Sequence, residues 1–119
     1  MILLEDTRQQ AEKHKAKHEW FTENGVEIVR TKLVVGDYSL PTDQRVCIDT
    51  KANLLEVCGN VTQQHRRFVE ELDRAKMLGI ELVILCEEGS IRTLEDVKHW
   101  KNPRLYRSPD SARGSYIKF

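Results

Sequence analysis

The stretch Val35–Lys51, VGDYSLPTDQRVCIDTK, holds a Gly-Asp turn, a loop that contains a proline, and a strand that ends in Asp-x-Lys. Side chains of a strand alternate between its two faces, so Asp49 and Lys51 point the same way. If the preceding strand pairs with this one as a hairpin, Asp37 comes near Asp49. Two carboxylates beside a lysine suit a hard divalent cation, which prefers oxygen ligands, and a phosphate, which needs a cation.

Length and composition indicate one soluble globular domain. The chain has 119 residues, of which 39% are hydrophobic and 32% charged, and this is enough for a core. Lys+Arg and Asp+Glu both number 19, so the formal net charge is zero and binding to a nucleic acid would require a local patch. No apolar run approaches the roughly 20 residues of a membrane span, and acidic residues after residues 1–4 argue against a signal peptide. The three cysteines are unclustered, which predicts reduced thiols and no cysteine zinc site.

The pattern of apolar residues predicts alternating strands and helices. Strands are expected over residues 1–4, 26–33, 46–51 and 80–86, the last of them as a central buried strand, and a further strand that carries Asp37 is expected before residues 46–51. Helices are expected over residues 9–24, 52–58, 62–78 and 93–100. Thr62 is predicted to cap the third helix, and Phe68, Leu72, Ala75 and Leu78 to form its buried stripe. The order strand, helix, strand, strand, strand, helix, helix, strand, helix predicts an α/β domain with a central mixed sheet flanked by helices.

Three side chains near the N-terminus have more than one interpretation. His14 and His18 have the i,i+4 spacing of some zinc sites on helices, but no third ligand is evident, so a solvated basic face is favoured. Asp6 is either a metal ligand or the N-cap of the helix that follows, and both can hold for one residue.

Four short motifs, taken in order, resemble those of the XPF/Hef nuclease family, which belongs to the restriction-endonuclease-like superfamily with its (D/E)-x-K signature. They are Asp6-x-Arg8, Gly36-Asp37, Asp49-x-Lys51 and the run RFVEELDR from Arg67 to Arg74. The resemblance covers roughly residues 1–88. Two positions depart from the family pattern, because Gln9 stands where the family usually has an acid and Thr50 where it has an arginine.

The resemblance implies a metal-dependent endonuclease that hydrolyses DNA near branched or flap junctions. Asp6, Asp37 and Asp49 would hold Mg²⁺ or Mn²⁺, and Lys51 would orient the attacking water or neutralise developing charge, so Asp37, Asp49 and Lys51 form the catalytic set. The candidate substrate-binding residues are Arg8, Arg67, Arg74, Lys101 and Arg104. The changes at Gln9 and Thr50 predict weaker or single-site metal binding.

We interpret residues 1–119 as a single nuclease domain with a core of about residues 1–88 and a C-terminal segment, residues 89–119, in which basic and aromatic side chains are interleaved. Such a mixture suits phosphate contacts and base stacking; the alternative is a loop packed over the sheet edge or an oligomer contact. From the resemblance we also expect DNA as partner, a homodimer, no membrane, and an intracellular, cytoplasmic protein of bacterial or phage type acting in DNA repair or recombination.

Two other functions stay open on the sequence. The first is a catalytically inactive DNA-binding or scaffolding subunit, which the joint retention of Asp37, Asp49 and Lys51 argues against. The second is a purely structural α/β protein, which the presence of all four motifs in order argues against.

Overall fold

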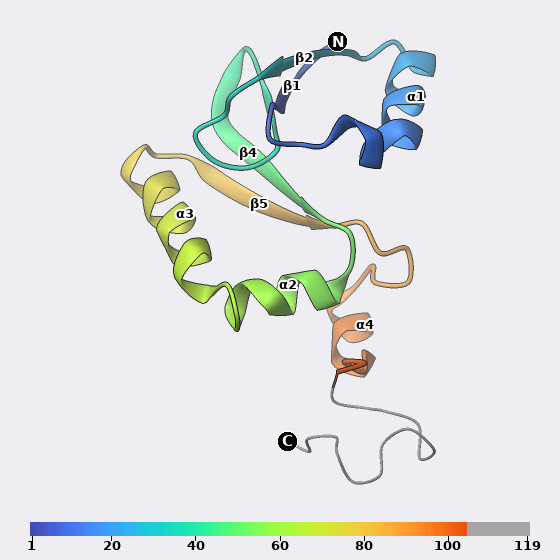
Figure 1. The fold of residues 1–119 in the computed structure, drawn as a ribbon, viewed down its shortest axis with the longest axis vertical. Coiled ribbons are helices and arrows are strands. Elements are labelled where there is room, and N and C mark those ends of the chain that lie inside the picture. The colour runs from blue at the N-terminus through green and yellow to red at the C-terminus, as the bar shows by residue number, and fades with distance from the viewer. Residues whose placement is uncertain (105–119) are drawn as a thin grey trace, which may run out of the picture.

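A five-stranded mixed sheet with helices on both faces organises the chain in the computed structural model, which describes residues 1–104 (Figure 1). The elements are β1 (Ile2–Asp6), a short 3-10 helix η1 (Ala11–His14), α1 (Lys15–Glu23), β2 (Glu27–Thr31), β3 (Tyr38–Leu40), β4 (Asp43–Lys51), α2 (Leu54–Val61), α3 (His65–Met77), β5 (Glu81–Cys86) and α4 (Leu94–His99). Apart from η1, this is the predicted order, so the α/β fold class is confirmed.

The sheet has the strand order β2-β1-β3-β4-β5. The outer pairs, β1 with β2 and β4 with β5, are parallel, while β3 pairs antiparallel with both β1 and β4. Parallel neighbours need a crossover connection, and α1 supplies one while α2 and α3 supply the other. Helix α1 covers the face that carries Tyr38, and α3 covers the opposite face, which carries Cys47 (Figure 1).

The apolar core is small and lies between α3 and the sheet. Val35, Cys47 and Ala75 are buried together, with Ile80 and Leu82 packed against them. All three cysteines are free thiols; Cys47 is buried, whereas Cys58 and Cys86 are half-buried.

The prediction that Leu72 and Leu78 belong to the buried stripe of α3 is wrong, because these side chains are 39% and 57% exposed. Only Ala75 of α3 is fully buried. The helix lies over β5, which is the last strand of the sheet, so its outer flank has no strand to pack on.

The prediction that residues 80–86 form a central strand is also wrong. Strand β5 pairs only with β4 and is an edge of the sheet. Helix α3 covers one of its faces, whereas Val83 and Leu85 on the other face are 38% and 47% exposed. The apolar run was correctly identified as a strand, but an apolar run alone does not distinguish a central strand from an edge strand.

Several helix boundaries differ from the prediction, and for two of them the side-chain contacts show why. The first helix begins at Lys15 after η1, since Asp6 does not cap it; the Asp6 carboxylate instead accepts the Arg8 backbone N–H at 3.2 Å within a turn. Thr62 ends α2 rather than beginning α3, because its hydroxyl donates to the carbonyl of Cys58 at 2.8 Å. None of the helices within residues 1–104 is long and apolar enough to cross a membrane.

Candidate active site

The turn before β3 places Asp37 beside β4. Gly36 has a φ of 74°, a left-handed conformation that a side chain disfavours. A Cβ at this position would lie 3.0 Å from the carbonyl oxygen of Ile48. The N–H of Asp37 donates to that same carbonyl at 2.7 Å. The glycine is therefore required by a close approach of two backbones, and this approach brings Asp37 to the strand that carries Asp49.

Asp49 is a buried carboxylate with an incomplete set of positive partners. It is 6% exposed, and its Oδ2 lies 3.0 Å from Nζ of Lys51. Burial, together with the charge and hydrogen bond of the neighbouring Asp37 carboxyl, raises the pKa of Asp49 to about 6, although Lys51 acts in the opposite direction. Asp37, Asp49 and Lys51 therefore converge as the sequence predicts, and a cation between the two acids would relieve their repulsion.

Thr50 fixes the orientation of Asp37. Its backbone N–H and its hydroxyl both donate to Oδ2 of Asp37, at 2.8 and 3.0 Å. The amide nitrogen of Gln9 in turn donates to the Thr50 hydroxyl at 3.4 Å. The two positions that depart from the family motifs thus contact each other next to the carboxylate pair.

The carboxylate pair fits a hard divalent cation. Mg²⁺ and Mn²⁺ prefer oxygen ligands, and Mg²⁺ is commonly bound by one or two carboxylates while keeping several waters. Within residues 1–104, no three His, Cys, Asp or Glu side chains gather in a way that could hold a metal. Asp37 and Asp49 could thus supply two ligands, and substrate oxygens or water would complete the coordination.

The backbone of Asp6 contacts the backbone of Asp37, but the Asp6 side chain binds other residues. Its N–H donates to the carbonyl of Asp37 at 2.8 Å. Its carboxylate, 2% exposed, accepts from Nε of Arg8 at 2.6 Å and from the N–H of Leu33 at 2.9 Å. Burial alone would raise the pKa of Asp6, but the hydrogen bonds from Arg8 and Leu33 lower it below its usual value. A direct metal-ligand role for Asp6 stays a prediction.

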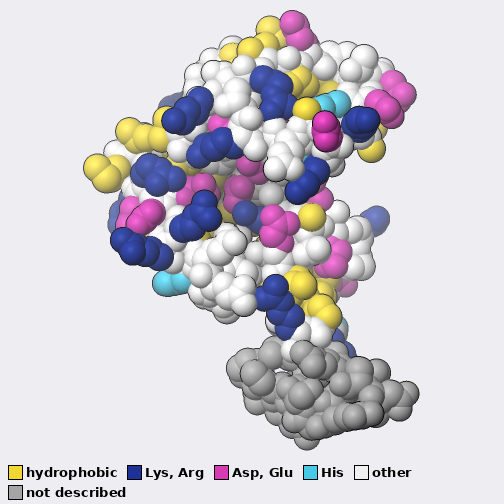
Figure 2. Space-filling model, in the orientation of Figure 1, with side chains coloured by type: hydrophobic (Ala, Val, Ile, Leu, Met, Phe, Trp, Pro, Cys, Tyr) yellow, Lys and Arg dark blue, Asp and Glu magenta, His cyan; other side chains and the backbone are white. Residues whose placement is uncertain are grey.

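Two of the three predicted catalytic residues line a hollow that α3 helps to form. Asp49 and Lys51 line it together with Arg67 and Glu71, and the remaining lining residues are Asn60, Gln64 and Phe68. Its volume is about 190 Å³. Figure 2 shows acidic side chains gathered at the waist of the molecule, between the strands above and α2 and α3 below, with basic side chains around them. Arg67 therefore reaches the site, whereas Arg74 is not among the residues that line this hollow.

Sequence reasoning did not identify Asn60, Gln64 and Glu71 as part of the site. A signal for Glu71 was present, because it follows Phe68 by three residues and so shares its helix face. Gln64 lies just before α3 and precedes Phe68 by four residues, so the same spacing applies to it. No such spacing marks Asn60, which lies near the end of α2.

The other predicted substrate-binding residues occupy different surroundings. Arg8 and Thr50 line a second hollow of about 440 Å³, and the Arg8 side chain is 57% exposed. Arg104 lines a third hollow, of about 260 Å³, beside α2, and Lys101 is exposed. The basic and aromatic positions predicted beyond Arg104 lie outside the described residues.

A mixed sheet flanked by helices, with two acids and a lysine converging on one strand, is consistent with a restriction-endonuclease-like nuclease domain. The family model of the ERCC4 domain matches residues 6–114, which is most of the chain. The chain therefore belongs to the ERCC4 domain family, and the predicted kinship with XPF/Hef-type nucleases is confirmed. Members of this family are nucleases, generally structure-specific and dependent on a divalent metal. No curated protein and no solved structure gave a match.

Proposed function

We propose that this chain is a divalent-metal-dependent endodeoxyribonuclease that hydrolyses phosphodiester bonds near branched or flap junctions in DNA. One observation carries the proposal: Asp37 and Asp49 lie together beside Lys51. Asp49 and Lys51 line a hollow that Arg67 also lines. Membership of a nuclease family supports hydrolysis of a nucleic acid.

Asp37 and Asp49 would hold the Mg²⁺ or Mn²⁺. When bound, the ion would acidify a water and neutralise charge on the phosphate. Thr50 keeps Asp37 in one orientation through its two hydrogen bonds. The Lys51 ammonium, held 3.0 Å from Asp49, stabilises the negative charge that develops on the phosphate oxygens. Asp6 contributes by holding Arg8 and the backbone of Asp37, and it becomes a ligand only if its bonds to Arg8 and Leu33 open.

Positive side chains on two sides of the carboxylate pair would bind the DNA backbone. Arg67 approaches from α3 and Arg8 from the loop after β1. Arginine matches phosphate with two parallel N–H donors. Because the whole chain has no net charge, binding to DNA would rest on local contacts of this kind. We propose that Arg104, Lys101 and Arg74 make weaker contacts to the DNA. A homodimer stays a prediction, which light scattering would test.

Cleavage of end-labelled DNA tests the proposal. Flap, fork and plain duplex DNA would be incubated with Mg²⁺, Mn²⁺ or EDTA and with the wild-type chain, Asp49→Ala or Asp43→Ala. Asp43 is the matched control because its carboxylate is exposed and pairs locally with Arg45 at 2.9 Å. We expect metal-dependent cutting, greatest on flap or fork DNA, that is lost in Asp49→Ala and kept in Asp43→Ala.

The opposite outcome is equally informative. If wild type and Asp49→Ala bind DNA alike and neither cuts it with any metal, the nuclease proposal is wrong. The chain would then be the inactive DNA-binding or scaffolding subunit that the sequence left open.

A further inference from the structure

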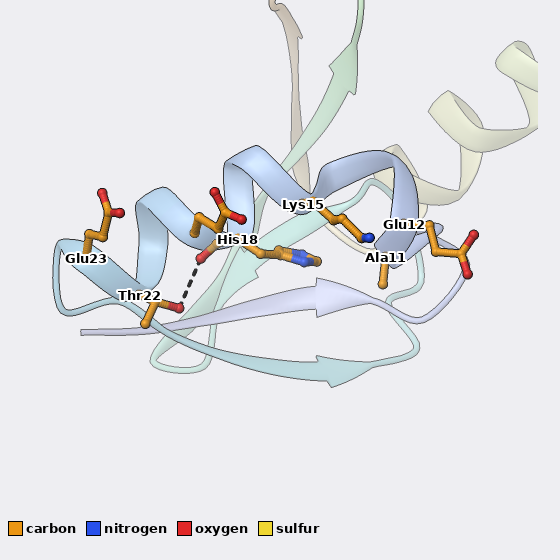
Figure 3. Close-up of a pocket in the computed structure, with 7 residues that line it drawn as sticks. Ala11, Glu12, Lys15, His18, Thr22 and Glu23 are labelled. Carbon is orange, nitrogen blue, oxygen red and sulfur yellow. Dashed lines mark hydrogen bonds between the residues drawn. The ribbon is translucent and has the colours of Figure 1, made fainter.

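A buried carboxylate that the proposed mechanism does not use lies on the other face of the sheet. Glu5 on β1 is fully buried. Its Oε2 accepts the hydroxyl of Tyr38 at 2.6 Å and contacts Nε2 of His18 at 2.8 Å, and its Oε1 accepts Nη1 of Arg30 at 3.0 Å. Figure 3 shows the His18 side chain extending from α1 into the space between that helix and the strands. The network thus joins α1, β1, β2 and β3.

The guanidinium of Arg30 also holds the loop that follows β1. While Nη1 is bound to Glu5, Nη2 donates to the backbone carbonyl of Thr7 at 3.2 Å and to that of Gln9. These two carbonyls flank Arg8, the arginine of the first family motif. A planar guanidinium can make these bonds together because its donors have a fixed fork geometry.

The same loop reaches the carboxylate pair from its other side. The Gln9 side chain donates to the hydroxyl of Thr50, and that hydroxyl donates to Oδ2 of Asp37. A continuous series of contacts therefore runs from the buried Glu5 through Arg30 and Gln9 to a proposed metal ligand.

We propose that Arg30 is a positioning residue for the active site, anchored by Glu5 and acting through the Gln9 backbone and Thr50 to fix Asp37; this inference rests on the proposed function. A purely structural role would need only the pairing with Glu5. The second nitrogen of Arg30 instead spans the two carbonyls of the motif loop. Two hollows of about 670 and 580 Å³ border this region, and both are lined by His18. The Arg30 side chain is 34% exposed, so it can be shortened without opening a hole in the core.

The test combines kinetics with amide hydrogen exchange of the metal-free protein. Arg30→Met, Gln9→Ala and their double variant would be compared with the wild type and with Arg45→Met, a control whose arginine is 82% exposed and pairs only with Asp43 among the described residues. The Thr50 amide is the reporter, because it donates directly to Asp37.

We expect Arg30→Met to lower kcat about tenfold with KM for DNA nearly unchanged, since it disturbs positioning rather than binding. Exchange of the Thr50 amide should be faster in Arg30→Met and in Gln9→Ala. The double variant should be no worse than Arg30→Met, because the two residues act in one series. Arg30→Lys, which keeps the charge but not the fork, should fall between Arg30→Met and wild type, and Arg45→Met should resemble wild type.

Three results would overturn the inference: Thr50 exchange and kcat at the wild-type level in Arg30→Met, effects of the two single variants that simply add, or full activity in a Gln9→Ala variant with unchanged Thr50 exchange. The last comparison decides the matter if Arg30→Met fails to fold. If the wild-type chain does not cut DNA, the proposed function fails, while the exchange data and their additivity still test the coupling between Arg30 and Asp37.

Discussion

Replacing Asp49 by asparagine should make the metal-free protein more stable while abolishing cleavage. Asp49 is buried beside another carboxylate, and its pKa is raised from 3.8 to about 6. The folded state therefore resists the ionised form that prevails near neutral pH. The asparagine side chain would keep a similar volume without that charge, so the cost of burying the charge disappears. The Asp49→Asn substitution should therefore raise stability and remove activity.

The size of the effect follows from the change in pKa. A difference between 3.8 and about 6 corresponds to about 3 kcal/mol at a pH above both values. Between these two values the folded protein keeps a proton that the unfolded chain has released, so stability falls as pH rises through this window. Because the substitution also deprives Lys51 of its charged partner, we expect a net gain of about 1–3 kcal/mol near pH 7.5, of which roughly half remains at pH 5.

Urea unfolding in EDTA measures this directly. Wild type, Asp49→Asn and the exposed control Asp43→Asn would be compared near pH 7.5 and near pH 5. Contributions that all three proteins share cancel in the comparison, so the difference between variant and wild type reports on Asp49. Added Mn²⁺ should stabilise wild type and not Asp49→Asn. If Asp49→Asn is less stable than wild type near pH 7.5, the Asp49 charge does not destabilise the metal-free protein, and the reasoning is refuted.

Other substitutions test separate parts of the structure. Tyr38→Phe removes a 2.6 Å hydrogen bond to the buried Glu5 carboxylate and should lower the free energy of unfolding by about 2 kcal/mol in a urea titration; a loss too small to measure would mean that water replaces the hydroxyl. Gly36→Ala should destabilise by about 1–3 kcal/mol and also lower kcat, since a Cβ would meet a β4 carbonyl at 3.0 Å; an unchanged thermal midpoint would contradict this. Arg67→Ala should weaken DNA binding and reduce its salt dependence, whereas Arg74→Ala should change both less; equal effects would remove the distinction between the two arginines.

The periodicity of apolar residues predicted the strands and helices well, but it did not predict which of their faces are covered. The strand that carries Asp49 and the hairpin that brings Asp37 to it follow from alternation and from the Gly-Asp turn. The exposure of one face of β5 did not follow, because an apolar run does not reveal whether a second helix covers it. The start of α1 was missed because the segment after Asp6 is held by side-chain contacts to Leu33 and Arg30 rather than by a helix cap.

The proposed site was predictable where the motif itself supplies both partners. Asp49 and Lys51 lie two apart on one strand, so their contact needs only the strand geometry. Contacts that join distant segments had no sequence signal. The Gln9–Thr50 hydrogen bond spans 41 residues and the Glu5–Tyr38 bond spans 33. A single sequence gives no reason to connect such positions before the sheet order is known.

Three buried acids in one sheet support the proposal that the carboxylate pair binds a cation. The apolar core is small, whereas Glu5, Asp6 and Asp49 are all buried. Each has a basic partner on hand: Arg30, Arg8 and Lys51 respectively.

Burial acts to raise the pKa of all three acids. At Glu5 the hydrogen bonds from Tyr38 and His18, helped by the charge of Arg30, outweigh burial and lower the pKa. At Asp6 the hydrogen bonds from Arg8 and Leu33 do the same. Of these three, only Asp49 keeps a raised pKa, because burial is the largest influence on it and the neighbouring Asp37 adds a negative charge, and the single Lys51 does not offset the two. Buried charge in proteins is stable only when it is paired. Glu5 and Asp6 are fully paired, and they hold the sheet and the loop after β1 in place. Asp49 is not fully paired, and a divalent ion bound by Asp37 and Asp49 would supply the missing positive charge.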